Sequence, residues 1–109
     1  MSNMFVYVTT ADVDEARRIG RAAVQGKLAA CANVVGGIDS IYWWRGEVRE
    51  TEEAMLVLKT MADRLAELIE LVNEMHSYEC PCIEAWPVTD GHRPFLDWVA
   101  EEVSREASR

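Results

Sequence analysis

The sequence predicts one α+β domain over residues 1–109. β-branched and aromatic residues gather in separate stretches, and between them lie stretches with apolar residues at helical spacing. Along the chain these stretches follow the order strand, helix, strand, strand, helix, strand, with a further helix at the end. This order is the split β-α-β arrangement of ferredoxin-like folds, which host many unrelated activities, so function has to be argued from sites.

The chain begins with a strand and a helix. Residues 4–10 are rich in β-branched and aromatic side chains and are expected to form a strand that is buried on both faces. Asp12 followed by Glu15 resembles a capping box, which predicts a helix beginning near residue 13. Gly26 suits the end of that helix.

A long β-hairpin is expected next. Strand-like residues over 28–35 and 38–44 flank Gly36-Gly37, where a bulge or bend is expected. A turn at 45–47 leads to the returning strand over 48–59. This hairpin is too long for a small sheet to bury along its length, so its far end is expected to reach a neighbouring subunit.

The last third of the chain predicts a helix, a strand and a short helix. Thr60 is expected to cap a helix whose apolar stripe consists of Leu65, Leu68, Ile69, Val72 and Met75. A strand follows over 80–88, and Pro81 and Pro87 predict that it lies at an edge or is broken at both ends. Pro94 opens the last helix, and the tail from residue 104 is polar.

The charge and the N-terminal sequence limit the classes of partner. The net charge is −8 and the basic residues are scattered singly, which disfavours a nucleic-acid partner. No basic leader and no apolar run of membrane-spanning length is present, so we expect a cytoplasmic protein with reduced thiols and no membrane partner. Four tryptophans are hard to bury in one small core, so some are expected at a subunit interface or a cleft.

Four residues are candidate metal ligands: Cys31, His76, Cys80 and Cys82. Soft thiolates with an imidazole suit copper(I) or zinc. In a strand, Cys80 and Cys82 would share one face with Cα atoms about 6.6 Å apart, so a disulfide between them would need a bend in the backbone. The two thiols can share one metal if the backbone bends at Pro81. The alternative is structural: buried thiols that pack as apolar side chains, Cys31 among them, and a histidine that caps the preceding helix.

A second candidate site combines the hairpin with the segment after the second helix. Its proposed ligand-binding residues are Tyr42, Trp44, Lys59, Tyr78 and Glu79, with Glu53 nearby. Tyr42 and Trp44 alternate onto one face, which predicts either a stacking surface for a small ligand or, as the favoured alternative, aromatic packing between subunits. No P-loop, dinucleotide-binding glycine pattern, Ser-His-Asp triad or HExxH helix is present, so neither an enzyme nor an organic cofactor is predicted.

Several segments together resemble the CutA family of divalent-cation tolerance proteins. The resemblance spans about residue 4 to residue 100 and is specific because the segments occur in the right order and spacing. They are residues 28–33, residues 40–46 with Glu53 and Lys59-Thr60 beyond, residues 76–79 followed by Pro81, and residues 95–98.

The resemblance implies a ferredoxin-like protomer in a PII-like homotrimer, with long hairpins extending across neighbours. It also implies a role in binding or tolerating copper and other divalent cations. A PII-like sensor that binds a small molecule in the intersubunit cleft is the alternative, and a scaffold for a protein partner is a third possibility.

The chain departs from the family pattern at the candidate metal ligands. The family usually has proline at Ser77, an aliphatic residue at Cys80 and a glutamate, located in the cleft, at Cys82. A thiol at this last position predicts a preference for softer metals, and Glu84 can supply a displaced carboxylate.

Overall fold

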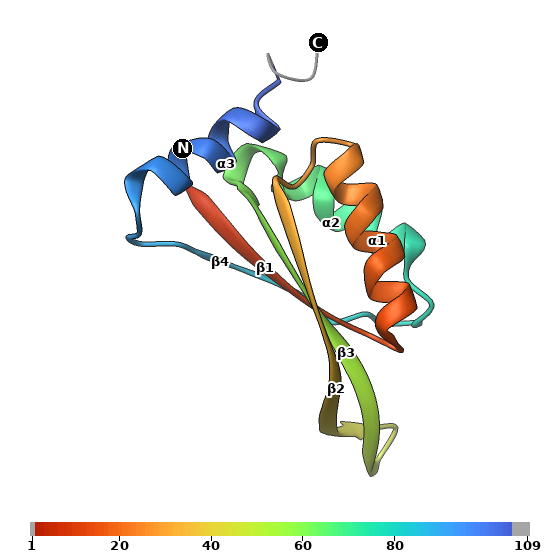
Figure 1. Ribbon diagram of the computed structural model, residues 1–109. Helices are drawn as coiled ribbons and strands as arrows, with labels where there is room; N and C mark the ends of the chain where they lie inside the picture. The colour runs from red at the N-terminus through yellow and green to blue at the C-terminus, as the bar shows by residue number, and fades with distance from the viewer. Residues whose placement is uncertain (1, 106–109) are drawn as a thin grey trace.

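The computed structural model describes residues 2–105 and confirms the predicted α+β order (Figure 1). The elements are β1 (Asn3–Thr10), α1 (Val13–Gln25), β2 (Cys31–Trp44), β3 (Glu47–Met61), a short 3₁₀ turn (Ala62–Arg64), α2 (Leu65–Met75), β4 (Ile83–Pro87) and α3 (Arg93–Val103). The strands form one antiparallel sheet in the order β2-β3-β1-β4. Among residues 2–105, no helix has the length and apolar character needed to cross a membrane.

One face of the sheet packs against α1 and α2. Val6 and Val8 of β1 and Leu56 and Leu58 of β3 are fully buried there, together with apolar residues of both helices. α3 packs elsewhere, around Met61 at one end of the sheet, in a separate small cluster.

The opposite face of the sheet, here called the open face, is only partly covered. The register places Phe5 beside Lys59 and Trp86, and Tyr7 beside Val57 and Glu84, and by alternation all of these side chains lie on the open face. Phe5 and Tyr7 are half-buried and Trp86 is 46% exposed. The expectation that β1 is buried on both faces is therefore wrong for the single chain, because none of the helices within residues 2–105 covers the second face along most of its length.

The predicted start and end of α1 are confirmed. Asp12 Oδ1 accepts a hydrogen bond from the backbone N–H of Glu15 at 2.8 Å, and the helix begins at Val13. Gly26 occupies the C-terminal cap, but the left-handed backbone conformation falls on the next residue, Lys27, with φ of 62°.

The predicted cap of α2 is wrong. Thr60 lies inside β3, where it is buried and its hydroxyl donates to the carbonyl of Leu28 at 2.7 Å. β3 continues to Met61 because it pairs with β1 as far as Asn3, so α2 begins only at Leu65. Tertiary pairing has extended the strand past a residue whose local preference is to cap a helix.

The last strand is shorter than predicted. β4 begins at Ile83, so Cys80, Pro81 and Cys82 lie in the loop before it, and the expected alternation of the two thiols along a strand does not occur. β4 is an edge strand, as its two flanking prolines predict. Proline has no N–H to give to a strand ladder, which is consistent with pairing that starts after Pro81.

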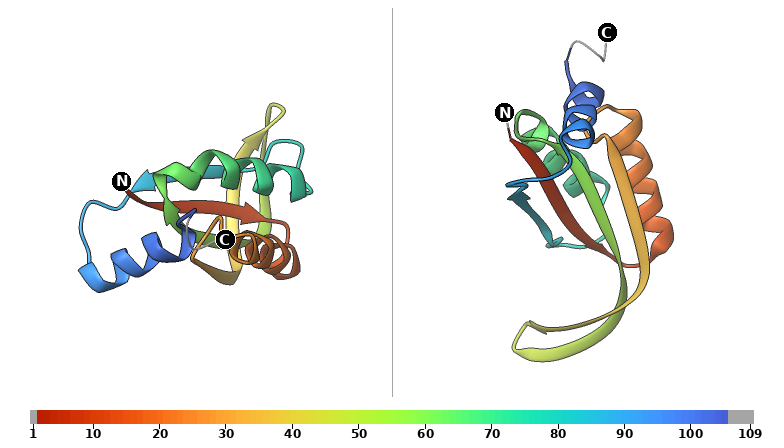
Figure 2. Two further views of the ribbon diagram at one scale, coloured as in Figure 1. Left: turned by 90° about the horizontal axis from the view of Figure 1, so that it is seen from above. Right: turned by 60° about the vertical axis from the view of Figure 1, so that its left-hand side comes forward.

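The hairpin extends beyond the sheet as a curved arm, defined here as residues 38–53 (Figure 2). The predicted bulge at Gly36-Gly37 is confirmed by a register shift between Val35 and Ile38. Gly37 has φ of +71°, a conformation that glycine adopts without strain. A Cβ at Gly36 would lie 2.7 Å from Val13 Cγ2, so the close approach of α1 also requires glycine. The bulge changes the alternation, so that Tyr42 and Trp44 lie on the same side as Glu53.

Candidate functional site

The segment from His76 to Cys82, here called the thiol loop, connects α2 to β4 and is tied to the body of the domain at its start. His76 Nε2 lies 2.8 Å from the carbonyl oxygen of Thr9, and its Nδ1 accepts from the N–H of Tyr78 at 3.1 Å. Because Nδ1 accepts, Nε2 carries the proton and donates to Thr9. Both ring nitrogens are thus engaged and the residue is buried, so in this arrangement His76 has no free lone pair for a cation.

A buried carboxylate holds the next residue of the thiol loop. Glu15 accepts from the N–H groups of Ser77 at 2.8 Å and Ala11 at 2.9 Å. Burial raises the pKa of Glu15, but these hydrogen bonds and nearby His76 outweigh that effect and lower the net pKa. An ionised Glu15 therefore fixes the start of the loop to α1.

The two residues that follow reach the arm. Tyr78 donates its phenolic hydrogen to Glu53 Oε2 at 2.6 Å, and Glu53 is buried at the base of the arm, opposite Ile38. Arg45, at the tip of the arm, donates to Glu79 Oε2 at 2.8 Å. Burial raises the pKa of Tyr78, and the hydrogen bond to Glu53 raises it further, so this phenol stays protonated at neutral pH.

The thiols lie at the end of the same loop. Cys80 is exposed, whereas Cys82 is half-buried with its Sγ 3.8 Å from Glu84 Oε1 on the open face. Burial, and then the negative charge of Glu84, raise the pKa of the Cys82 thiol. Tyr7 lies close by, and its pKa is raised by burial and by the charges of Cys82, Glu53 and Glu84.

Cys31 is not part of this cluster. It begins β2, pairs with Lys59 and has its Sγ 3.8 Å from Asn33 Oδ1. β2 and β4 are three strand positions apart, which separates Cys31 from Cys82 by at least about 14 Å. Across residues 2–105, the structure brings no three His, Cys, Asp or Glu side chains together as a metal site. Cys82 and Glu84 therefore offer at most half of a coordination shell in one chain.

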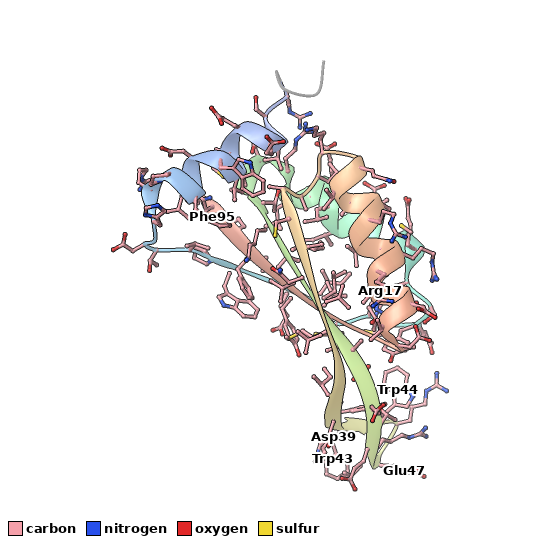
Figure 3. The ribbon with its side chains drawn as sticks, in the orientation of Figure 1. Arg17, Asp39, Trp43, Trp44, Glu47 and Phe95 are labelled. Atoms are coloured by element: carbon pink, nitrogen blue, oxygen red, sulfur yellow. The ribbon has the colours of Figure 1, made fainter. Side chains whose placement is uncertain are left out.

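The predicted ligand-binding residues fall into two places. Tyr42 and Trp44 share one side of the arm, where Tyr42 OH accepts from Thr51 at 3.4 Å and Arg45 lies 5.3 Å from the centre of the Trp44 ring. Since Arg45 also binds Glu79, the arm places Trp44 beside the thiol loop. Figure 3 shows Trp43 and Trp44 on opposite sides of the arm.

Lys59 lies apart from the other predicted ligand-binding residues. Its ammonium lies 5.5 Å from the centre of the Phe95 ring, against α3. An extended strand places Lys59 about 20 Å from Glu53, six residues earlier, and so far from Tyr78. Figure 3 likewise shows Phe95 at the end of the sheet away from the arm.

Glu15, Tyr7 and Arg45 are participants that the sequence did not predict as members of the site. The sequence identifies Glu15 only as a helix-capping residue, although its side chain also accepts a hydrogen bond from the N–H of Ser77 in the thiol loop. Tyr7 belongs to a strand that the sequence predicts to be buried on both faces. Only the antiparallel register with β4 places Tyr7 beside Glu84. Alternation along β1 puts Tyr7 on the second face, but nothing local indicates which elements cover that face.

Comparison with known proteins agrees with this architecture. The sequence model of the family described as CutA1 divalent ion tolerance protein matches residues 4–102. The divalent-cation tolerance protein CutA of Archaeoglobus fulgidus is 40% identical over 99 residues, covering 91% of this chain and 96% of that protein. The protein of the same name from Thermus thermophilus is 43% identical over 96 residues, covering 88% and 93%.

Solved structures show the same fold. CutA from Xylella fastidiosa superimposes with a TM-score of 0.92 at 31% identity, covering 95% of this chain and 100% of the other. The A. fulgidus structure, named a periplasmic divalent cation tolerance protein, gives a TM-score of 0.90 at 39% identity, covering 94% and 99%. The described strands, helices and long hairpin, together with matches over nearly the whole chain, lead to one conclusion: this chain belongs to the CutA1 divalent ion tolerance family.

Proposed function

We propose that this protein is a homotrimeric divalent-cation tolerance protein whose binding site favours soft cations of the copper type. Membership of the family supports the general role in cation tolerance. The preference for soft cations rests on one observation, the Cys82 Sγ that lies 3.8 Å from Glu84 Oε1 on the open face. A thiolate is a soft ligand that suits copper(I) and zinc, and a neighbouring carboxylate can complete a charged donor pair.

The proposal includes assembly because one chain supplies only part of a coordination shell. Cys82 and Glu84 provide two donors, whereas zinc in a structural site takes four. The open face carries half-exposed aromatic groups beside these donors, with the Phe5 and Trp86 ring centroids 5.3 Å apart. Contact between open faces would bury this apolar surface and bring donors from different protomers together. A trimer with cation sites between subunits accounts for both features.

The test is a titration with copper(I) and with zinc under reducing conditions. The wild type is compared with the Cys80→Ser/Cys82→Ser double variant, and Cys31→Ser is the matched control that removes a thiol far from Glu84. We expect the double variant to bind at least about tenfold more weakly, a difference of about 1.4 kcal/mol. Equal affinity of wild type and double variant would remove this thiol pair from the site.

The pH dependence of binding provides an independent check. The cation displaces the thiol proton, so affinity is expected to rise with pH until Cys82 is deprotonated. Because the pKa of Cys82 is raised, this increase is expected to continue past the ordinary thiol range before the affinity levels off. In the double variant, that dependence is expected to be lost.

A PII-like sensor of small molecules is the second candidate function. Tyr42 and Trp44 lie on the side of the arm that the thiol loop contacts, and Arg45 and Glu79 supply charges at its tip. A thermal-shift screen of anionic and nucleotide-like metabolites tests it, because a ligand that binds the folded state raises apparent stability. Ligands that raise the melting temperature of wild type equally in a Trp44→Ala variant would exclude this surface. We place either activity in the cytoplasm, where thiols remain reduced.

A further inference from the structure

The first residues of the thiol loop are hydrogen-bonded to several distant parts of the chain. Each of its first four residues has a partner on a different part of the chain. These partners are Thr9 on β1, Glu15 on α1, Glu53 at the base of the arm and Arg45 at its tip. Cys80 and Cys82 follow immediately, so the position of the thiols depends on these attachments.

The link between Tyr78 and Glu53 is the strongest attachment to the arm. At 2.6 Å it is a short hydrogen bond to a carboxylate, and such bonds are roughly twice as strong as neutral ones. Glu53 is 7% exposed and opposes Ile38, the first paired residue after the bulge. The bond therefore joins the loop to the position where the arm leaves the sheet.

The neighbouring residue reaches the other end of the arm. Glu79 pairs with Arg45 at 2.8 Å, with both side chains largely exposed, so this ion pair alone contributes little. Arg45 also lies over the Trp44 ring. Consecutive residues of one loop thus contact the base and the tip of the arm, and Arg45 connects Glu79 of that loop to the Trp44 ring.

We infer that Tyr78, held by Glu53, is a positioning residue for the Cys80/Cys82 thiols, and that it couples occupancy of these thiols to the position of the hairpin arm. The inference rests on the proposed cation site and adds its regulation: cation binding changes the arm, and the arm changes cation affinity. The two effects are reciprocal because coupling between sites is a single free energy.

The experiment uses Trp44 fluorescence as the reporter of the arm. In a background with Trp43→Phe, Trp86→Phe and Trp98→Phe, Trp44 is the remaining tryptophan. Zinc is the probe because it has no redox chemistry and binds thiolates. We expect zinc to change Trp44 emission, and we expect Tyr78→Phe to reduce this change and the zinc affinity by about threefold or more.

Thr51→Val is the matched control. It also removes one hydroxyl group, but that hydroxyl donates to Tyr42 within the arm. We expect Thr51→Val to keep the zinc affinity and the Trp44 response of the parent. A zinc-induced Trp44 change that is identical in Tyr78→Phe and the parent overturns the inference, as does zinc binding with no Trp44 change in the parent.

A measurement without metal separates failure of the inference from failure of the proposed function. In a Cys31→Ser background, the reaction of Cys80 and Cys82 with a chromogenic aromatic disulfide is followed in the parent, Tyr78→Phe and Thr51→Val. We expect reaction with half-buried Cys82 to be about threefold or more faster in Tyr78→Phe only, with unchanged circular dichroism. Equal rates refute the positioning role even if zinc binds. Faster reaction in Tyr78→Phe without zinc binding by any variant supports positioning and refutes the cation site together with its coupling to the arm.

Discussion

The two faces of the sheet differ although they are built from the same strands. On the helix-covered face, Val6, Val8, Leu56 and Leu58 are completely buried. On the open face, Phe5 and Tyr7 remain half-buried and Trp86 is 46% exposed, beside charged Glu84. The first face completes the fold within one chain, whereas the second keeps apolar surface exposed beside polar groups.

The two faces therefore divide the expected effects of sequence changes: changes on the helix-covered face should affect stability, and changes on the open face should affect assembly. A completely buried side chain makes its contacts inside the protomer. A half-exposed aromatic side chain such as Trp86 would gain further burial only where a second chain covered it.

The largest expected effect is on the helix-covered face. Leu56→Ala removes a side chain that is 0% exposed and closely approached by α1 at Gly20, so we expect a loss of about 2–5 kcal/mol in the free energy of unfolding. Urea denaturation at fixed protein concentration measures it. Ile69→Ala on the exposed side of α2 is the control, and equal losses in both variants would contradict the division.

The next effect concerns assembly through the open face. Trp86→Arg places a charge where the Phe5 and Tyr7 rings meet Trp86, and we expect the concentration for half-assembly to rise by about tenfold or more. For a trimer this is about 2.7 kcal/mol per trimer, because the assembly constant scales with the square of that concentration. Light scattering over a dilution series reports the mass, and circular dichroism checks that the protomer stays folded. An unchanged mass at all concentrations would show that the open face is not the interface.

A smaller effect is expected at the start of the thiol loop, and it depends on pH. Glu15 has a lowered pKa, so its contribution is present above the unfolded value near about 4.3 and is lost as pH falls through the folded value. We expect Glu15→Gln to cost about 1–3 kcal/mol at pH 7, with the difference from wild type shrinking below about pH 4. Unfolding curves across this range measure the trend, and Asp14→Asn, on an exposed neighbour, should show a smaller and flatter difference.

The smallest effect is expected from exposed ion pairs. Arg93 and Asp97 lie 3.6 Å apart on the surface of α3, with both side chains more than half exposed. We expect Asp97→Asn to change stability by less than about 0.5 kcal/mol, and salt to remove that difference. Thermal unfolding at low and high ionic strength provides the measurement. A loss comparable to that of Leu56→Ala would mean that α3 contributes much more to the fold than its small cluster with Met61 indicates.

Local features of the sequence were enough for part of the fold. The Asp12 cap, the bulge at Gly36-Gly37 and the edge position of β4 each follow from the chemistry of one or two residues. Thr60 shows the limit, because its preference for a cap was overridden by pairing of β3 with β1.

The candidate site was less predictable because its members come from distant segments. Tyr42 and Trp44 on the arm lie near Glu79 of the thiol loop, because Arg45 contacts both Glu79 and the Trp44 ring. Lys59 separates from them because a strand carries it toward α3, and Cys31 separates from Cys82 because three strand positions lie between them. These separations depend on strand order, which local pattern does not specify.

The order of the elements, the family resemblance and the presence of two closely spaced thiols after the second helix follow from residue type and spacing along the chain alone. Three-dimensional contacts determine which face of the sheet stays open, which carboxylates hold the thiol loop and which candidate ligands meet. Those outcomes depend on strand register and on contacts between residues far apart in the sequence, such as Glu15 with Ser77 and Glu53 with Tyr78.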